Sequence, residues 1–180
     1  ACAGKKGQSA RAIEYANKAA VADNRLAWAY RTVGFMRLRW LKDSSGAEQA
    51  LEEALKLEPQ AAEVRDMLID IKLSANDFDG AIDLAQAGIK RSPHSAPEYF
   101  KLSQIYTQQW RLREALKELD ATIRNDSNTA KYFRSRAAIK KLKGDLAGAI
   151  SDQQVAVSLA KDKGFELVEL AGMNIAAGNA

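Results

Sequence analysis

The chain has 180 residues, of which 28% are charged and 47% hydrophobic, as in an ordinary folded protein. No apolar run approaches the ~18 residues that a membrane-spanning helix needs, and a net charge of +4 is too weak alone to indicate a nucleic-acid partner. A single cysteine and a single histidine exclude an internal disulfide and a Cys/His zinc cluster within one chain.

A small residue returns every 34 positions along most of the chain, at Ala47, Ala81, Ala115 and Ala149. A fixed period of this length indicates a repeat protein built from helix–turn–helix units. The sequence therefore predicts a stack of similar helix pairs, with function on an extended surface and not in one central pocket.

Turn-forming residues interrupt the helical apolar spacing at 43–46, 76–77 and 143–145. Pro59 and Pro93 are also 34 residues apart. Because proline disfavours helical backbone in the residue before it, each proline predicts the end of a second helix.

The best matches to a family pattern come from both helices of the unit. A second helix shows an alanine, a large apolar residue, a small residue and a proline, at Ala47, Leu51, Ala54 and Pro59. A first helix shows an aromatic, an apolar residue, a small residue and another aromatic, at Tyr99, Leu102, Ser103 and Tyr106. The chain resembles the tetratricopeptide repeat (TPR) family in this register, although Gln153 stands where the family has an apolar residue.

The resemblance implies an all-α fold, a right-handed superhelical solenoid of antiparallel helix pairs that forms a single domain over 1–180. Ala12 lies 35 residues before Ala47, so we expect one extra residue in the turn near Ser44 and Ser45. The last helix is expected to be a cap or, as we favour, part of a longer array. The expected units are a lone second helix at 8–24, repeats at 27–61, 62–95, 96–129 and 130–163, and a capping or truncated helix at 164–180.

In the TPR family the first helices line a concave face, and repeat positions 2, 5, 9 and 12 point into it. Tryptophan, phenylalanine and arginine are side chains that anchor interfaces. Trp28 and Phe35 could equally pack between repeats. Carried onto this chain, these positions are Trp28, Arg31, Phe35, Leu38, Glu63, Asp66, Asp70, Leu73, Pro97, Phe100, Gln104, Thr107, Lys131, Arg134, Ala138 and Lys141. The residues that we expect to contact a partner are Trp28, Arg31, Phe35, Leu38, Asp66, Asp70, Phe100, Gln104, Lys131, Arg134 and Lys141.

The clamp that many TPR proteins use to grip the terminal carboxylate of heat-shock chaperones is disfavoured. Lys131 occupies one clamp position, but Ser135 stands where the clamp has arginine. Asp66 and Asp70 stand where it has lysine and asparagine, and they would repel a carboxylate.

A basic cluster lies between 131 and 143. Its simplest interpretation is a solvated helix face, and a sharper one is a site for an acidic peptide or phosphate groups. RNA is a third option, disfavoured because a one-base-per-repeat code needs matching polar residues in every repeat. The cluster consists of Lys131, Arg134, Arg136, Lys140, Lys141 and Lys143.

No catalytic motif occurs, so we expect no enzyme, no cofactor and no metal site. His94, between Pro93 and Ser95, is expected to be a solvated turn residue. Ala1 and Cys2, followed by small and basic residues, resemble the end of a bacterial lipoprotein signal, in which the cysteine is acylated. The apolar segment of such a signal is missing, and the alternative is the tail of a first helix.

The first functional hypothesis is a non-enzymatic scaffold that binds an extended peptide or a partner's helix in a concave groove, with a cytoplasmic location favoured. The alternative is an envelope lipoprotein of the periplasm or outer membrane that acts as an assembly factor. A further alternative is a module that self-associates through its terminal helices or binds RNA.

Overall fold

The computed structural model describes residues 26–178 and, before them, residues 11, 14, 15 and 18. Cys2 and most of the lone helix predicted at 8–24 lie outside the described residues. Within the described part every regular element is helical, which confirms the all-α class. None of these helices is long and apolar enough to cross a membrane.

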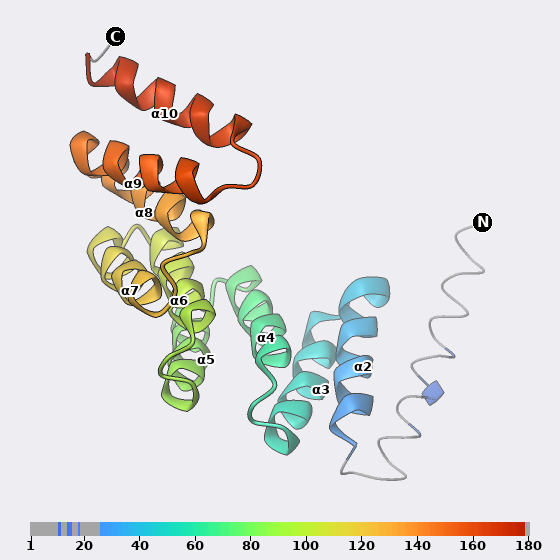
Figure 1. The fold of residues 1–180 in the computed structure, drawn as a ribbon. Coiled ribbons are helices and arrows are strands. Elements are labelled where there is room, and N and C mark those ends of the chain that lie inside the picture. The colour runs from blue at the N-terminus through green and yellow to red at the C-terminus, as the bar shows by residue number, and fades with distance from the viewer. Residues whose placement is uncertain (1–10, 12–13, 16–17, 19–25, 179–180) are drawn as a thin grey trace, which may run out of the picture. The chain divides into compact units, whose positions relative to one another are not determined.

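The first of two compact units spans Ala1–Arg91. Helix α2 pairs with α3, α4 pairs with α5, and α3 also contacts α4 (Figure 1). The elements are α2 (Ala27–Met36), a π-helical turn η1 (Arg37–Leu41), α3 (Ser44–Leu57), α4 (Ala62–Ser74) and α5 (Phe78–Arg91).

The second unit spans Ser92–Ala180 and repeats the same plan. Helix α6 pairs with α7 and α8 pairs with α9, while α7 contacts α8 and α9 contacts α10. Each second helix therefore packs against its own first helix and against the first helix that follows. The elements are α6 (Ala96–Gln108), α7 (Leu112–Asn125), α8 (Ala130–Leu142), α9 (Leu146–Leu159) and α10 (Gly164–Ala176).

The four periodic alanines are fully buried where paired helices pack. Ala47, Ala81, Ala115 and Ala149 are each 0% exposed. The first helix of the first pair also needs a small residue where it packs on the second helix. A Cβ built on Gly34 would lie 2.5 Å from the Leu51 Cγ. Helix axes can approach at the short end of the ~8–10 Å range only if small residues occupy the crossing.

The turns inside the helix pairs also keep the 34-residue register. Lys42, Asn76, Trp110 and Gly144 all adopt positive φ, at 57°, 59°, 57° and 82°. Glycine adopts this left-handed conformation without strain, whereas a residue such as Trp110 does so at a cost of ~1–2 kcal/mol. The same tight turn is thus built from four unrelated residues, which hides it from sequence comparison between the repeats.

Aspartate side chains cap three of the second helices. The carboxylates of Asp43, Asp77 and Asp145 accept hydrogen bonds of 2.9, 3.0 and 2.9 Å from backbone N–H groups three residues on. Such caps satisfy a donor that the first turn of a helix leaves free. The second helices therefore begin just after the turn residues at which the sequence predicts a break.

The extra residue of the first pair does not lie in the turn near Ser44 and Ser45, so that expectation was wrong. Residues 27–41 are continuously helical and end in the π-helical turn η1, whereas the later first helices have 13 residues each. A π-helical turn is the means by which a helix absorbs one additional residue. The helix accommodates it because the following turn is fixed by the Lys42 conformation and the Asp43 cap.

Enlarging a periodic alanine should destabilise the fold. We expect Ala115→Leu to lower the free energy of unfolding by about 1–3 kcal/mol, because the buried crossing of α6 and α7 has no room for an isobutyl group. Urea unfolding followed by circular dichroism measures the change. Ala147→Leu, at an exposed site on α9, is the matched control. Equal stability of the two variants would contradict this packing.

Candidate functional site

The second unit contains two adjoining hollows along its first helices. The α6–α8 hollow has a volume of about 320 Å³ and the α8–α10 hollow about 500 Å³. Ser135, Ala138 and Leu142 of α8 line both of them. Together the two hollows form one groove, hereafter the unit 2 groove.

The α6 wall of the α6–α8 hollow is aromatic and polar, and most of the remaining lining is apolar. Its α6 wall consists of Phe100, Ser103, Gln104 and Thr107. The Phe100 ring lies 4.9 Å from that of Tyr132, and the Lys131 Nζ lies 4.7 Å from the Phe100 centroid. This geometry holds an ammonium group over an aromatic face, where the cation and the ring attract each other.

The α8–α10 hollow lies between a basic and an apolar wall. Arg134 and Lys141 come from α8, and Phe165, Glu169 and Met173 come from α10. The Arg134 guanidinium lies 5.3 Å from the centroid of the Phe165 ring. The two walls of this hollow therefore offer a bound peptide charged hydrogen-bond donors from α8 and apolar surface from α10.

All five residues of the second unit that the sequence predicts as partner contacts lie in or beside the unit 2 groove. Phe100, Gln104, Arg134 and Lys141 line the groove, and Lys131 lies over the ring of Phe100. Thr107 and Ala138, also named from the family pattern, line it as well, whereas Pro97 does not.

The positions predicted for the first unit lie on α2, η1 and α4. Trp28 and Phe35 are half-exposed, and the Phe35 ring meets that of Trp40 edge to face at 6.5 Å. Arg31 forms an exposed ion pair of 3.5 Å with Glu63. Leu38 is half-buried against the core of this unit. Asp66 and Asp70 are exposed on α4, and Leu73 of the same helix is half-buried.

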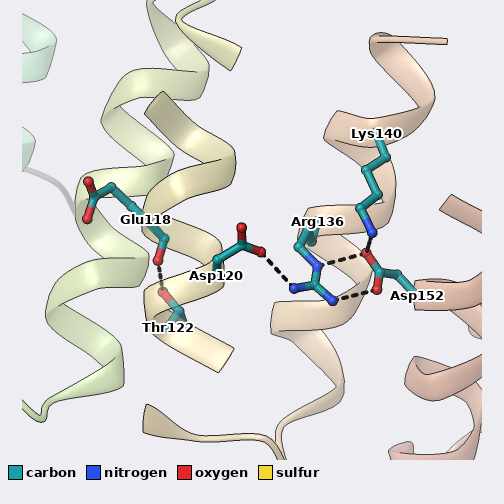
Figure 2. A network of polar contacts seen from close by, with 6 residues as sticks. All are labelled: Glu118, Asp120, Thr122, Arg136, Lys140 and Asp152. Carbon is teal, nitrogen blue, oxygen red and sulfur yellow. Dashed lines mark hydrogen bonds and ion pairs between the residues drawn. The ribbon is translucent and has the colours of Figure 1, made fainter. Parts of the chain in front are cut away.

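The basic cluster of α8 is not simply a solvated face. Arg136 donates two hydrogen bonds, of 2.8 and 2.7 Å, to the buried carboxylate of Asp152 and a third of 2.8 Å to Asp120 (Figure 2). Lys140 lies 2.8 Å from the same Asp152 carboxylate. Arg136 and Lys140 thus connect α8 to its neighbours α7 and α9 and are occupied by internal partners.

This network shifts the acid–base behaviour of its members. Burial alone would raise the pKa of Asp152, but the hydrogen bonds and charges of Arg136 and Lys140 outweigh it, and the pKa lies below its ordinary value. The hydrogen bond with Asp152 raises the pKa of Arg136. Asp152 is therefore ionised, and it neutralises part of the basic cluster.

Helix α10 is fastened by a second polar cluster. The buried Glu166 carboxylate accepts a 2.7 Å hydrogen bond from Arg134 and another of 2.7 Å from the Gln153 side-chain amide. The same amide donates to the Glu166 carbonyl at 3.0 Å. Gln153 is fully buried on α9. It departs from the family pattern because its side-chain amide donates hydrogen bonds to Glu166 of the next helix.

The sequence analysis missed Asp152 and Glu166. Both are buried carboxylates, and buried carboxylates almost always have partners. The one available signal was Gln153 itself, since a polar residue at an apolar register position calls for a polar partner nearby. Among the residues that the structure describes, no group of histidine, cysteine or acidic side chains could hold a metal ion.

Comparison with known proteins identifies related folds. The family model for the tetratricopeptide repeat matches residues 41–102 and 72–139. A comparison with curated proteins finds no match.

Three solved structures have the same fold over most of their length. MamA is 21% identical, with a TM-score of 0.72 over 86% of this chain and 90% of that one. YrrB, described as a TPR protein with an unusual peptide-binding site, is 19% identical, with a TM-score of 0.69 over 92% and 85%. TTC0263, a protein of Thermus thermophilus, is 22% identical, with a TM-score of 0.63 over 85% and 84%.

Removing the charge of Asp152 should destabilise the second unit. We expect Asp152→Asn to lower the free energy of unfolding by about 2–4 kcal/mol at neutral pH, because Arg136 and Lys140 lose a buried counter-ion. Since the folded-state pKa of Asp152 is lowered, its contribution is fully present above about pH 4 and is lost as the pH falls through the folded-state value.

The measurement is urea unfolding of wild type and variant between pH 7 and pH 2.5, in which the two should converge at low pH. Asp120→Asn is the matched control, because it removes the half-exposed partner of the same arginine and should cost less than about 1 kcal/mol. A difference between wild type and Asp152→Asn that did not depend on pH would contradict the assignment.

Removing the Glu166 carboxylate should loosen α10 selectively. We expect Glu166→Ala to speed amide hydrogen exchange in 164–176 by about 10-fold, because Arg134 and Gln153 lose the group that ties them to this helix. Exchange in 112–125 should change little. Glu169→Ala on the same helix is the control, and equal acceleration by both variants would refute the role of Glu166.

Proposed function

Because the chain belongs to the tetratricopeptide repeat family, we propose that it is a protein-interaction scaffold that binds an extended peptide or a helix of a partner in the unit 2 groove. Proteins of this family generally act through protein partners. One observation carries the proposal: the first helices α6, α8 and α10 line two adjoining hollows that share Ser135, Ala138 and Leu142.

The lining of the groove suits a peptide chain. Phe100 and Phe165 supply aromatic surface, and Gln104 and Thr107 supply groups that can donate or accept hydrogen bonds. Ala138 is small and exposed between the two hollows, which leaves room for a backbone to pass. The peptide-binding site named for YrrB, a protein of the same fold, supports this class of ligand.

The exposed aromatic side chains of the first unit are proposed as a separate contact surface for a protein partner. Trp28 and Phe35 keep about half of their surface open to solvent, at 52% and 49%. Side chains of this kind commonly contribute most of the affinity of an interface. Arg31, beside them on α2, would add a charged hydrogen-bond donor.

Blocking the groove tests the proposal. Peptides selected from a displayed random library for binding to the intact chain should lose at least about 10-fold in affinity for Ala138→Trp, because the indole fills the space between the hollows. Fluorescence anisotropy of the labelled peptides measures the affinity.

Ala147→Trp is the matched control, since Ala147 is exposed on α9 and lies outside both hollows. This variant should bind the peptides as tightly as wild type does. Binding in the unit 2 groove would be contradicted if Ala138→Trp left the affinity of the selected peptides unchanged. It would also be contradicted if both variants lowered that affinity equally.

A further inference from the structure

We propose that the unit 2 groove selects an amphipathic peptide segment, with apolar side chains directed at α10 and acidic side chains directed at α8, toward Lys141 of the α8–α10 hollow and Lys131 beside Phe100 of the α6–α8 hollow. This inference rests on the proposed function and names the chemistry of the partner. It follows from an apolar strip on α10 and from the uncompensated positive charge beside it.

The apolar strip consists of Phe165, Val168, Gly172 and Ile175. Spacings of three and four residues place them on one face of α10. Phe165, Val168 and Ile175 are 59%, 71% and 73% exposed. Large apolar side chains with this much free surface in a contiguous row indicate a binding surface.

The repeat register shows that this strip is not the face that pairs with a following helix. The residues 34 positions earlier are Lys131, Arg134, Ala138 and Lys141, and all of them stay exposed or half-exposed although α9 packs on α8. A helix packed on α10 in the same way would leave the strip open. The occupant is therefore a ligand of the face that the first helices leave open.

The positive charge on α8 is only partly neutralised. Arg134 is paired with Glu166 at 2.7 Å. Lys131 lies over the rings of Phe100 and Tyr132, which do not cancel its charge, and Lys141 has no ionic or hydrogen-bonding partner among the described residues. Two ammonium groups thus remain available to carboxylates of a ligand.

Glu169 limits where an acidic side chain can lie. Its carboxylate lines the α10 wall of the same hollow and would repel an acidic group placed there. The acidic side chains of the ligand must therefore face α8, while its apolar side chains face the strip. This arrangement predicts that Glu169→Gln tightens the binding of an acidic ligand by about twofold.

The test uses the full chain and a fluorescein-labelled synthetic helix with leucine and phenylalanine on one face and glutamate beside it. Companion peptides replace every glutamate with lysine, every glutamate with glutamine, or every apolar residue with serine. We expect the glutamate peptide to bind at least about 10-fold more tightly than the lysine and serine peptides, and to weaken as salt rises.

Two pairs of variants locate the binding. Lys141→Glu should weaken the glutamate peptide by at least about fivefold, while Lys143→Glu, an exposed charge at the end of the same helix outside both hollows, should not. Val168→Ser combined with Ile175→Ser should weaken it by about 10-fold, while Leu167→Ser, exposed on α10 but off the strip, should not.

Failure has two distinguishable forms. If the lysine or glutamine peptide binds best and is lost on Ala138→Trp, the proposed function stands and the acidic partner class is wrong. If none of the designed peptides binds, this inference fails, and the proposed function stands or falls with the library-selected peptides and Ala138→Trp. Equal binding of a single-stranded RNA of the same net charge, unaffected by the serine variants of the strip, would also overturn the partner class.

Discussion

The close contact between paired helices at Ala47, Ala81, Ala115 and Ala149 is the constraint on which the rest of the structure depends. A methyl group at each crossing lets the two helices of a pair pack with almost no space between them. Within each unit, the second helices α3, α7 and α9 are then contacted on two sides, by their own first helix and by the next one. The first helices of the second unit keep an open face, and the unit 2 groove consists of these faces.

Polar contacts complete the packing where the apolar pattern weakens. The sequence of α9 is the poorest match to the second-helix pattern, because Gln153 occupies a buried apolar position. Asp152 and Gln153 compensate by binding Arg136 and Lys140 of α8 and Glu166 of α10. Polar groups of this kind fix register more specifically than apolar contacts do, and they position both walls of the α8–α10 hollow. The cations of α8 are therefore divided: Arg134, Arg136 and Lys140 bind carboxylates of the protein, whereas Lys131 and Lys141 remain available to the proposed ligand.

Much of the fold was predictable, because the 34-residue period fixes the succession of helix pairs and the small residues buried between them. The resemblance to the tetratricopeptide repeat family, and not the period, gave Phe100, Gln104, Arg134 and Lys141 as residues of the binding face, and all four line the two hollows. It could not predict the ion pairs of Arg136 and Arg134, since long side chains can reach several acidic residues and the choice depends on rotamers. It also misplaced the extra residue of the first pair, because a π-helical turn preserves helical spacing on both sides and leaves no turn-forming residue to mark it.

Mapping a bound peptide onto the second unit by hydrogen exchange tests the central claim most directly. If the open faces of the first helices form the binding surface, the peptide should slow exchange in 96–108, 130–142 and 164–176, the segments of α6, α8 and α10. The second helices, 112–125 and 146–159, should exchange as in the free protein. Slowed exchange confined to α7 and α9, with α6, α8 and α10 unchanged, would contradict it.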